Sequence, residues 1–212
     1  ITQLNLLQNI RDEGPSLHLK KKNTPTMGGV FIILPFLILL LVVNSNFNSI
    51  GILLLFFCTL GFFIIGFLDD YLSIRNRKNT GLKAIEKFIL QSFIAILFIA
   101  LVSNNIYTSS LISLSIDWNI NTTLIIIPIY FLILVGLSNA VNLTDGLDGL
   151  ASGCSSIVFY GLGTEIFIKG QKEIIIYGLI SYAMSGLCMG FLKFNKYPAK
   201  IFMGDTGSLP IG

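Results

Sequence analysis

The stretch GFFIIGFLDDYLSIRNRKN, residues 61–79, runs from the end of a long apolar segment into two adjacent carboxylates and then into basic residues. An apolar run of about 20 residues can cross a bilayer as a helix. An ionised carboxylate in hydrocarbon is costly, so acids at such positions normally reach water, a partner or a metal. The sequence therefore predicts a spanning helix over residues 50–68, with Asp69 and Asp70 at its polar end.

The composition of the whole chain is that of a polytopic membrane protein. Of the 212 residues, 53% are hydrophobic and only 12% are charged, far from the values of soluble domains. We predict an all-α bundle, a single transmembrane domain over residues 1–212. Its six expected spans are 27–43, 50–68, 88–102, 124–141, 155–168 and 174–191. The fifth is short and contains Gly161 and Gly163, so a tilted or partly re-entrant helix stays open for it.

The charge and the cysteines exclude two classes of function. A net charge of +3 is too small and too scattered to indicate nucleic-acid binding. The three cysteines lie in or beside apolar runs without a C-x-x-C spacing, so we expect packing residues rather than a zinc site.

The basic residues orient the predicted bundle. Twelve of the 14 Lys and Arg residues fall on one side if the six spans are right, and only Lys169 and Lys172 fall opposite. By the positive-inside rule the side with twelve is cytoplasmic. Five acids in three separate loops are expected on that same side: Asp69, Asp70, Asp145, Asp148 and Asp205.

The segment NAVNLTDGLDGLASG, residues 139–153, places Asp145 and Asp148 three residues apart, which puts them on one face if the segment is helical. An Asp-Gly turn between two helices is the alternative reading. The segment KYPAKIFMGDTGSLPIG, residues 196–212, surrounds Asp205 with small residues ahead of an apolar segment. This suits a metal or phosphate site near a helix N-terminus, although a solvated N-cap would look the same.

The segment HLKKKNTPTMGGV, residues 18–30, combines a lysine run with a Thr-Pro-Thr turn and two glycines at the start of a span. The lysines alone are typical of a cytoplasmic anchor, and a lone loop histidine such as His18 is usually solvated. The turn and the glycines indicate a backbone built for close packing or ligand approach.

Taken together, these segments point to chemistry on a phosphorylated substrate. Several carboxylates with glycines, hydroxyls and nearby basic residues are what a hard divalent cation and a diphosphate require. The sequence therefore predicts Mg²⁺-dependent phosphoryl transfer at the membrane surface, where the protein mainly positions the reactants and stabilises charge.

The four segments, in this order, resemble the phospho-N-acetylmuramoyl-pentapeptide transferases of the polyprenyl-phosphate N-acetylhexosamine-1-phosphate transferase superfamily. The resemblance implies a multi-pass enzyme of ten spans in the bacterial inner membrane, often dimeric, with its active site on the cytoplasmic face. Such an enzyme moves phospho-MurNAc-pentapeptide from UDP-MurNAc-pentapeptide to undecaprenyl phosphate, giving lipid I and UMP in peptidoglycan synthesis with Mg²⁺ present.

The resemblance also assigns residues. It implies that Asp69, Asp70 and Asp205 are catalytic and that Asp205 binds the metal. Substrate-binding roles fall to Lys21, Thr26, Lys87, Asn142, Asp145 and Asp148, the last three on the nucleotide side. Lys83 lies one helical turn from Lys87, so the match of that lysine is looser. We expect the chain to be a fragment without the family's first span and later histidine-rich loop, and therefore an incomplete active site.

Alternatives remain open for both the reaction mechanism and the class of protein. One aspartate of the pair is expected to act as a general base on the lipid phosphate, with Asp69 assigned to it, while a covalent aspartyl route is also conceivable. A relative that uses UDP-GlcNAc would share the motifs. A transporter would place ionisable residues near the bilayer midplane, but the predicted spans contain none except Glu165.

Overall fold

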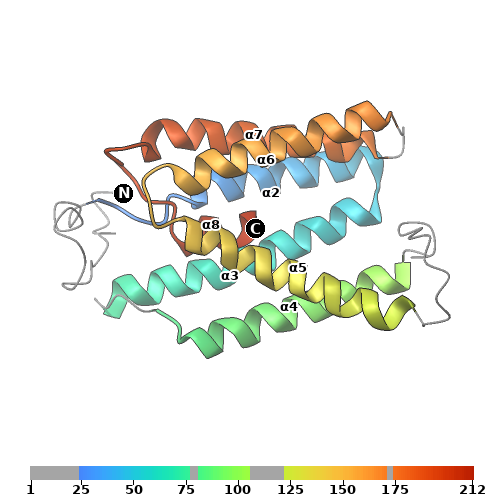
Figure 1. Cartoon of the computed structure of the whole chain (residues 1–212), viewed down its shortest axis with the longest axis horizontal. Helices are drawn as coiled ribbons and strands as arrows, with labels where there is room; N and C mark the ends of the chain where they lie inside the picture. The colour runs from blue at the N-terminus through green and yellow to red at the C-terminus, as the bar shows by residue number, and fades with distance from the viewer. Residues whose placement is uncertain (1–23, 77–80, 106–121, 171–173) are drawn as a thin grey trace.

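The computed structural model describes residues 24–76, 81–105, 122–170 and 174–212 (Figure 1). Over these residues the chain forms helices and connecting segments without a β-sheet, which confirms the predicted all-α class. The helices are α2 (Val30–Phe47), α3 (Ile50–Asn76), α4 (Ala84–Asn105), α5 (Thr122–Thr144), α6 (Leu150–Lys169), α7 (Ile175–Asn195) and α8 (Asp205–Ile211).

The helices α2 to α7 are each long and apolar enough to cross a membrane. They run side by side along the long axis of the molecule (Figure 1). Many large apolar side chains on them are exposed, such as Ile38, Phe93 and Ile157. Such surfaces suit lipid contact, so the chain is a multi-pass membrane protein.

Helix α3 differs from the expectation that Asp69 and Asp70 lie in a loop. The apolar run ends at Leu68, but the helix continues to Asn76, so both acids lie within it. Residues 69–76 contain no glycine or proline that would end the helix. The prediction of three acid-bearing loops is therefore wrong for this pair, and a helix holds the two carboxylates.

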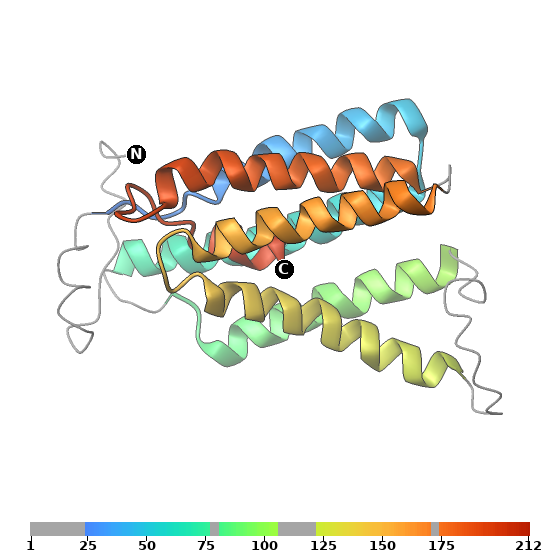
Figure 2. The ribbon, with the colours of Figure 1, turned by 45° about the horizontal axis from the view of Figure 1, so that its top comes forward.

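The fifth apolar run forms one continuous helix. Helix α6 begins at Leu150, five residues before the predicted start, and continues to Lys169, where Gly170 ends it in a left-handed conformation. A re-entrant segment is thereby excluded. The sixth run, which forms α7, packs along the length of α6 (Figure 2).

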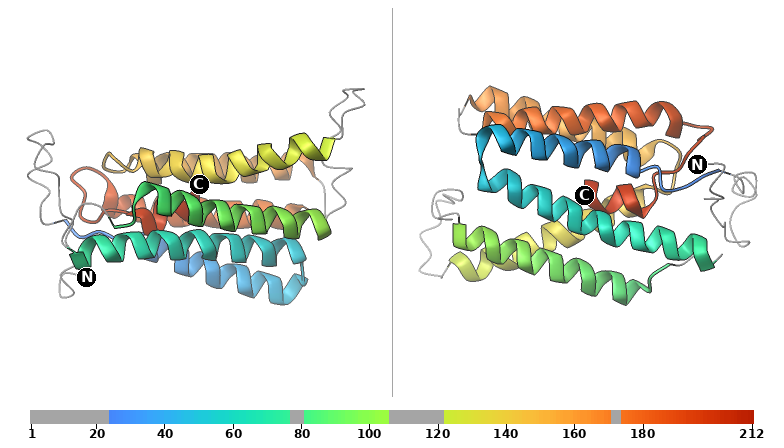
Figure 3. Two further views of the ribbon diagram at one scale, coloured as in Figure 1. Left: turned by 90° about the horizontal axis from the view of Figure 1, so that it is seen from below. Right: turned by 180° about the vertical axis from the view of Figure 1, so that it is seen from behind.

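The short helix α8 lies inside the bundle and contacts α3, α5 and α2 (Figure 3). Two apolar clusters hold this arrangement. The larger one joins α2 and α7 through buried side chains that include Ile33, Leu40 and Met184. The smaller one joins Phe62 and Ile65 of α3 to Leu209 of α8. Because α8 begins at Asp205, this packing brings that residue to the acidic pair of α3.

Candidate active site

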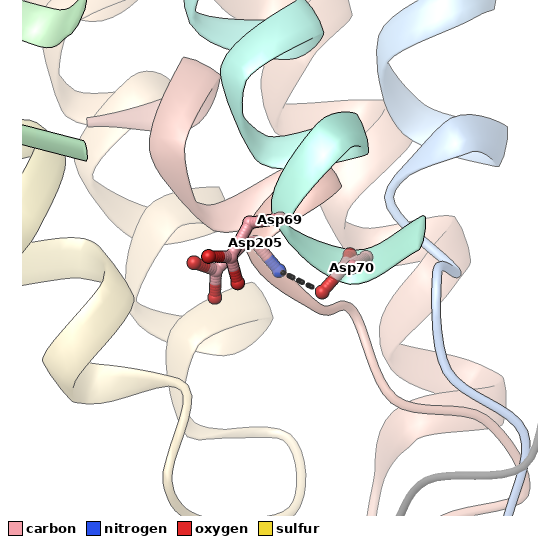
Figure 4. Close-up of side chains that lie close together, drawn as sticks. All are labelled: Asp69, Asp70 and Asp205. Atoms are coloured by element: carbon pink, nitrogen blue, oxygen red, sulfur yellow. Dashed lines mark hydrogen bonds between the residues drawn. The ribbon is translucent and has the colours of Figure 1, made fainter. Parts of the chain in front are cut away.

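Three carboxylates from two helices form the centre of the site. Asp69 and Asp70 come from α3 and Asp205 from the start of α8, and each offers an oxygen within 4.8 Å of the others. Figure 4 shows the Asp69 and Asp205 side chains beside each other, with Asp70 on the other side of the Asp205 backbone. Asp69 and Asp70 are buried although both are acids. Like charges this close need a cation or protons to coexist.

Lys87 supplies one cation. Its Nζ forms ion pairs with Asp205 and with Asp69, where the distance to Oδ1 is 3.2 Å. Lys83, one turn earlier, is exposed, so of these two lysines Lys87 is the one that lies at the acids. Asn142 of α5 donates from Nδ2 to the same Asp205 Oδ2 at 3.2 Å. Residues from α3, α4, α5 and α8 thus meet at one carboxylate.

Asp70 has a different environment from Asp69. Its Oδ2 accepts hydrogen bonds from the backbone amide of Thr206 at 2.9 Å and from the Thr206 hydroxyl at 2.6 Å. Its Oδ1 accepts from the backbone amide of Asp205 at 3.2 Å. The two amides belong to the first turn of α8, where backbone N–H groups have no partner within the helix, so Asp70 caps that helix from a neighbouring one.

The Thr-Pro-Thr segment runs beside the segment that precedes Asp205. The amide of Phe202 donates to the Pro25 carbonyl, and the amide of Gly29 donates to the Met203 carbonyl, both at 2.8 Å. At Gly29 a Cβ would overlap the backbone of Gly207, so only glycine allows α2 to start this close to α8. Thr26 is buried in the same region. The glycine pair is therefore explained by close packing.

The two acids of residues 139–153 hold the loop between α7 and α8. Asp145 Oδ2 accepts from the Gly204 amide at 3.2 Å, and Asp148 Oδ2 accepts from the Ala199 amide at 3.0 Å. Asp145 thereby joins the acidic centre through the residue next to Asp205, whereas Asp148 contacts the loop farther from it. Their nucleotide-side role stays a prediction.

Burial and nearby charges raise the pKa values of two acids outside the spans, Asp145 and Asp205. Burial raises the pKa of Asp145 to about 7, and the charges of Asp205, Asp70 and Asp148 add to the effect while the hydrogen bond from Gly204 opposes it. Burial also raises the pKa of Asp205, and the nearby Lys87 opposes that rise. Both carboxyls hold a proton more tightly than they would in water.

Two residues that the motif analysis did not assign also shape the site. Thr206 is fully buried and binds Asp70, as described above. Asn195, at the end of α7, accepts from the Gly149 amide and the Ser152 hydroxyl and donates to the Ile201 carbonyl. It links the loop of Asp145 to the loop before Asp205. In the sequence, only its position as a polar residue after an apolar run could have indicated that Asn195 has a structural role.

Most predicted site residues therefore meet at one end of the bundle: Thr26, Asp69, Asp70, Lys87, Asn142, Asp145 and Asp205. Lys21 lies outside the described residues, as does His18. The cluster of Asp69, Asp70 and Asp205 offers carboxylate oxygens alone, which are the ligands that hard divalent cations prefer, so it could bind a metal.

Comparison with known proteins agrees with the motifs. The profile of glycosyl transferase family 4 matches residues 52–212, and signature 1 of the phospho-N-acetylmuramoyl-pentapeptide-transferases matches residues 21–33. The enzyme of that name from Prochlorococcus marinus strain MIT 9515 is 75% identical over 212 residues, which are 100% of this chain and 58% of the relative. The one from P. marinus subsp. pastoris is 74% identical, with 59% of it covered.

The likeness extends beyond that genus. The phospho-N-acetylmuramoyl-pentapeptide-transferase of Bacillus subtilis strain 168 is 41% identical over 214 residues, covering 100% of this chain and 65% of the relative. The chain thus spans roughly three fifths of the length of the curated relatives it matches. The resemblance to these transferases is confirmed, and the chain belongs to glycosyl transferase family 4.

Proposed function

We propose that the full-length protein transfers phospho-MurNAc-pentapeptide from UDP-MurNAc-pentapeptide to undecaprenyl phosphate, forming lipid I and UMP. The observation that carries the proposal is the convergence of separate motif segments on one buried acidic site at the end of a membrane bundle. A water-soluble nucleotide sugar and a lipid phosphate can meet only at such a boundary. The names of the relatives support this choice of substrates.

Asp69 is the better candidate for the general base. Both oxygens of Asp70 already accept hydrogen bonds from the start of α8, whereas Asp69 accepts from the Leu82 amide and pairs with Lys87 through Oδ1. In the proposed step Asp69 takes the proton from the phosphate hydroxyl of the lipid. The freed oxygen bonds to the β-phosphorus of the nucleotide sugar. The bond from that phosphorus to the bridging oxygen breaks, and UMP leaves with the electron pair.

Lys87 would stabilise the developing charge on the phosphates. In this structure its ammonium is shared between Asp69 and Asp205, and it is 17% exposed, so it can turn toward a bound diphosphate. Asn142 fixes Asp205 through its amide. Asp205, with help from Asp69 or Asp70, would hold Mg²⁺, which when bound supplies neutralisation of the diphosphate charge.

The basic residues support a cytoplasmic position for the site. The end of α3, the start of α4 and the end of α7 lie at one end of the bundle (Figure 1). These segments carry Arg75, Lys83, Lys87 and Lys193. Lys169, the last residue of α6, lies at the opposite end of the bundle. The positive-inside rule therefore favours the cytoplasmic face of the bacterial inner membrane for the acids. Homodimer formation stays a prediction.

The test is UMP release by the full-length protein in detergent or liposomes. UDP-MurNAc-pentapeptide is supplied with and without undecaprenyl phosphate and Mg²⁺, and UDP-GlcNAc is run in parallel. We expect release that requires both the lipid and the metal and that ignores UDP-GlcNAc. Release from UDP-GlcNAc alone would move the protein to the related GlcNAc-1-phosphate transferases. No release from either would overturn the proposal.

A further inference from the structure

An amide pair lies one helical turn away from Lys87 and Asn142. Gln91 follows Lys87 by four residues on α4, and Asn139 precedes Asn142 by three on α5, so each lies on the same helix face as its neighbour. Asn139 Nδ2 donates to Gln91 Oε1 at 2.7 Å. The helices α4 and α5 are therefore linked by polar contacts at two successive turns. At the first turn Lys87 and Asn142 both bind Asp205, and at the second Asn139 binds Gln91 directly.

The amide pair is an unusual choice for simple packing. Gln91 is fully buried, and within the part of the chain described its Nε2 has no hydrogen-bond partner. A buried donor without a partner costs free energy, which an apolar side chain of similar size would not. Stability alone would thus favour a residue such as methionine at this position. The amide must serve a purpose other than filling space.

The apolar packing between these two helices is interrupted along part of their length. Farther from the acids, a pocket of about 440 Å³ that is open to the surface lies between α4 and α5. Its lining is apolar: Ile96, Ile99, Ala100, Ile127, Pro128 and Phe131. Helices separated by such a space can shift against each other, because few atoms oppose the movement. A directional hydrogen bond near the acids limits that shift.

We propose that Gln91 is a positioning residue for the transfer reaction. Its hydrogen bond to Asn139 holds α4 and α5 at the spacing at which Lys87 and Asn142 both reach Oδ2 of Asp205. Loss of the bond lets Lys87 move relative to Asp205 while the rest of the site stays in place. This inference rests on the transferase function proposed above.

The experiment uses three variants of the full-length protein: Gln91→Asn, Asn139→Gln, and both changes together. Gln91→Asn keeps a buried amide but shortens it by one methylene, so the bond to Asn139 is lost. The double variant restores the summed length of the two side chains. Mispositioning of a reactive group by 1 Å can cost about 100-fold in rate, so we expect at least a roughly tenfold loss of kcat in Gln91→Asn.

The effect should appear in kcat and leave the KM values for the nucleotide sugar and the lipid within about twofold, because binding contacts remain. The double variant should recover at least about half of the lost kcat if the amide contact is what matters. Ser156→Ala is the matched control. Ser156 forms a buried hydrogen bond to Ser185 between α6 and α7, away from Asp205. It should lower the melting temperature without changing kcat.

The outcomes separate the two proposals. If the wild-type protein releases no UMP, the proposed function fails. If it is active and folded Gln91→Asn has the wild-type kcat, or if the double variant is no better than the single ones, the positioning role is overturned. A Gln91→Asn protein that melts early yet keeps its kcat would show that the pair serves stability alone, which also overturns it.

Discussion

Asp70 of α3 accepts two hydrogen bonds from Thr206 of α8, one from the backbone amide at 2.9 Å and one from the hydroxyl at 2.6 Å. Two helices more than 130 residues apart in sequence are therefore joined at the first turn of the shorter one. Asp69, the adjacent residue, instead faces Lys87 and Asp205. The two neighbouring aspartates therefore differ in their contacts: Asp70 binds the first turn of the helix that carries Asp205, and Asp69 pairs with Lys87.

Replacing Asp70 should therefore affect folding. Asp70→Ala leaves the two Thr206 donors and the Asp205 amide without their acceptor in a buried place, at about 1–3 kcal/mol for each. We expect a clear fall in melting temperature in detergent, together with loss of activity. Asp70→Asn keeps one carbonyl oxygen and should lose less stability. A melting temperature of Asp70→Ala equal to that of the wild type would contradict the capping role.

Replacing Asp69 should affect the reaction instead. Asp69→Asn keeps an oxygen for the Leu82 amide but cannot take a proton, and it leaves Lys87 with Asp205 as its remaining carboxylate partner. Removal of a general base typically costs about 10²–10⁴-fold in rate, so we expect a loss of kcat in that range with little change in melting temperature. UMP release and thermal unfolding, measured on the same preparation, check both. Retained kcat would show that Asp69 is not the base.

The long helices and the acidic end of the bundle could be predicted from sequence because both depend on local patterns. An apolar run of membrane length specifies a helix by itself, and the lysines and arginines specify its direction. The end of α3 could not be predicted in this way. Hydrophobicity marks where the apolar run stops, at Leu68, whereas the helix continues through the acids to at least Asn76.

The partners of the site residues could not be predicted because they depend on how distant helices pack. The sequence predicts a substrate-binding role for the acids of residues 139–153, and that role stays a prediction. It does not predict that Asp145 and Asp148 accept hydrogen bonds from backbone amides of the loop before α8. Gln91 and Asn195 belong to none of the motif segments. Their contacts appear only when the helices are assembled, since one buried amide can join segments that no local pattern relates.

Close packing of α3 on α8 gives a steric prediction. At Gly66 of α3 a Cβ would overlap the carbonyl of Asp205, a backbone atom that cannot rotate away. Gly66→Ala should push α8 from α3, lower the melting temperature and reduce activity together. Gly136→Ala is the control, because Gly136 also lies within a long helix but a Cβ there meets nothing within 4 Å. It should be neutral or slightly stabilising, and equal effects of the two changes would contradict the packing.

The raised pKa of Asp145 predicts how stability depends on pH. Burial and neighbouring acids raise this pKa from 3.8 to about 7, so the folded state binds a proton more tightly than the unfolded state. The melting temperature of the metal-free protein should therefore fall as the pH rises from about 4 to about 7, because ionisation of the buried carboxyl favours unfolding. Asp145→Asn cannot ionise and keeps an oxygen for the Gly204 amide. With EDTA present, the melting temperature of this variant minus that of the wild type should be larger at pH 8 than at pH 5. A difference that is the same at both pH values would show that Asp145 is ionised throughout.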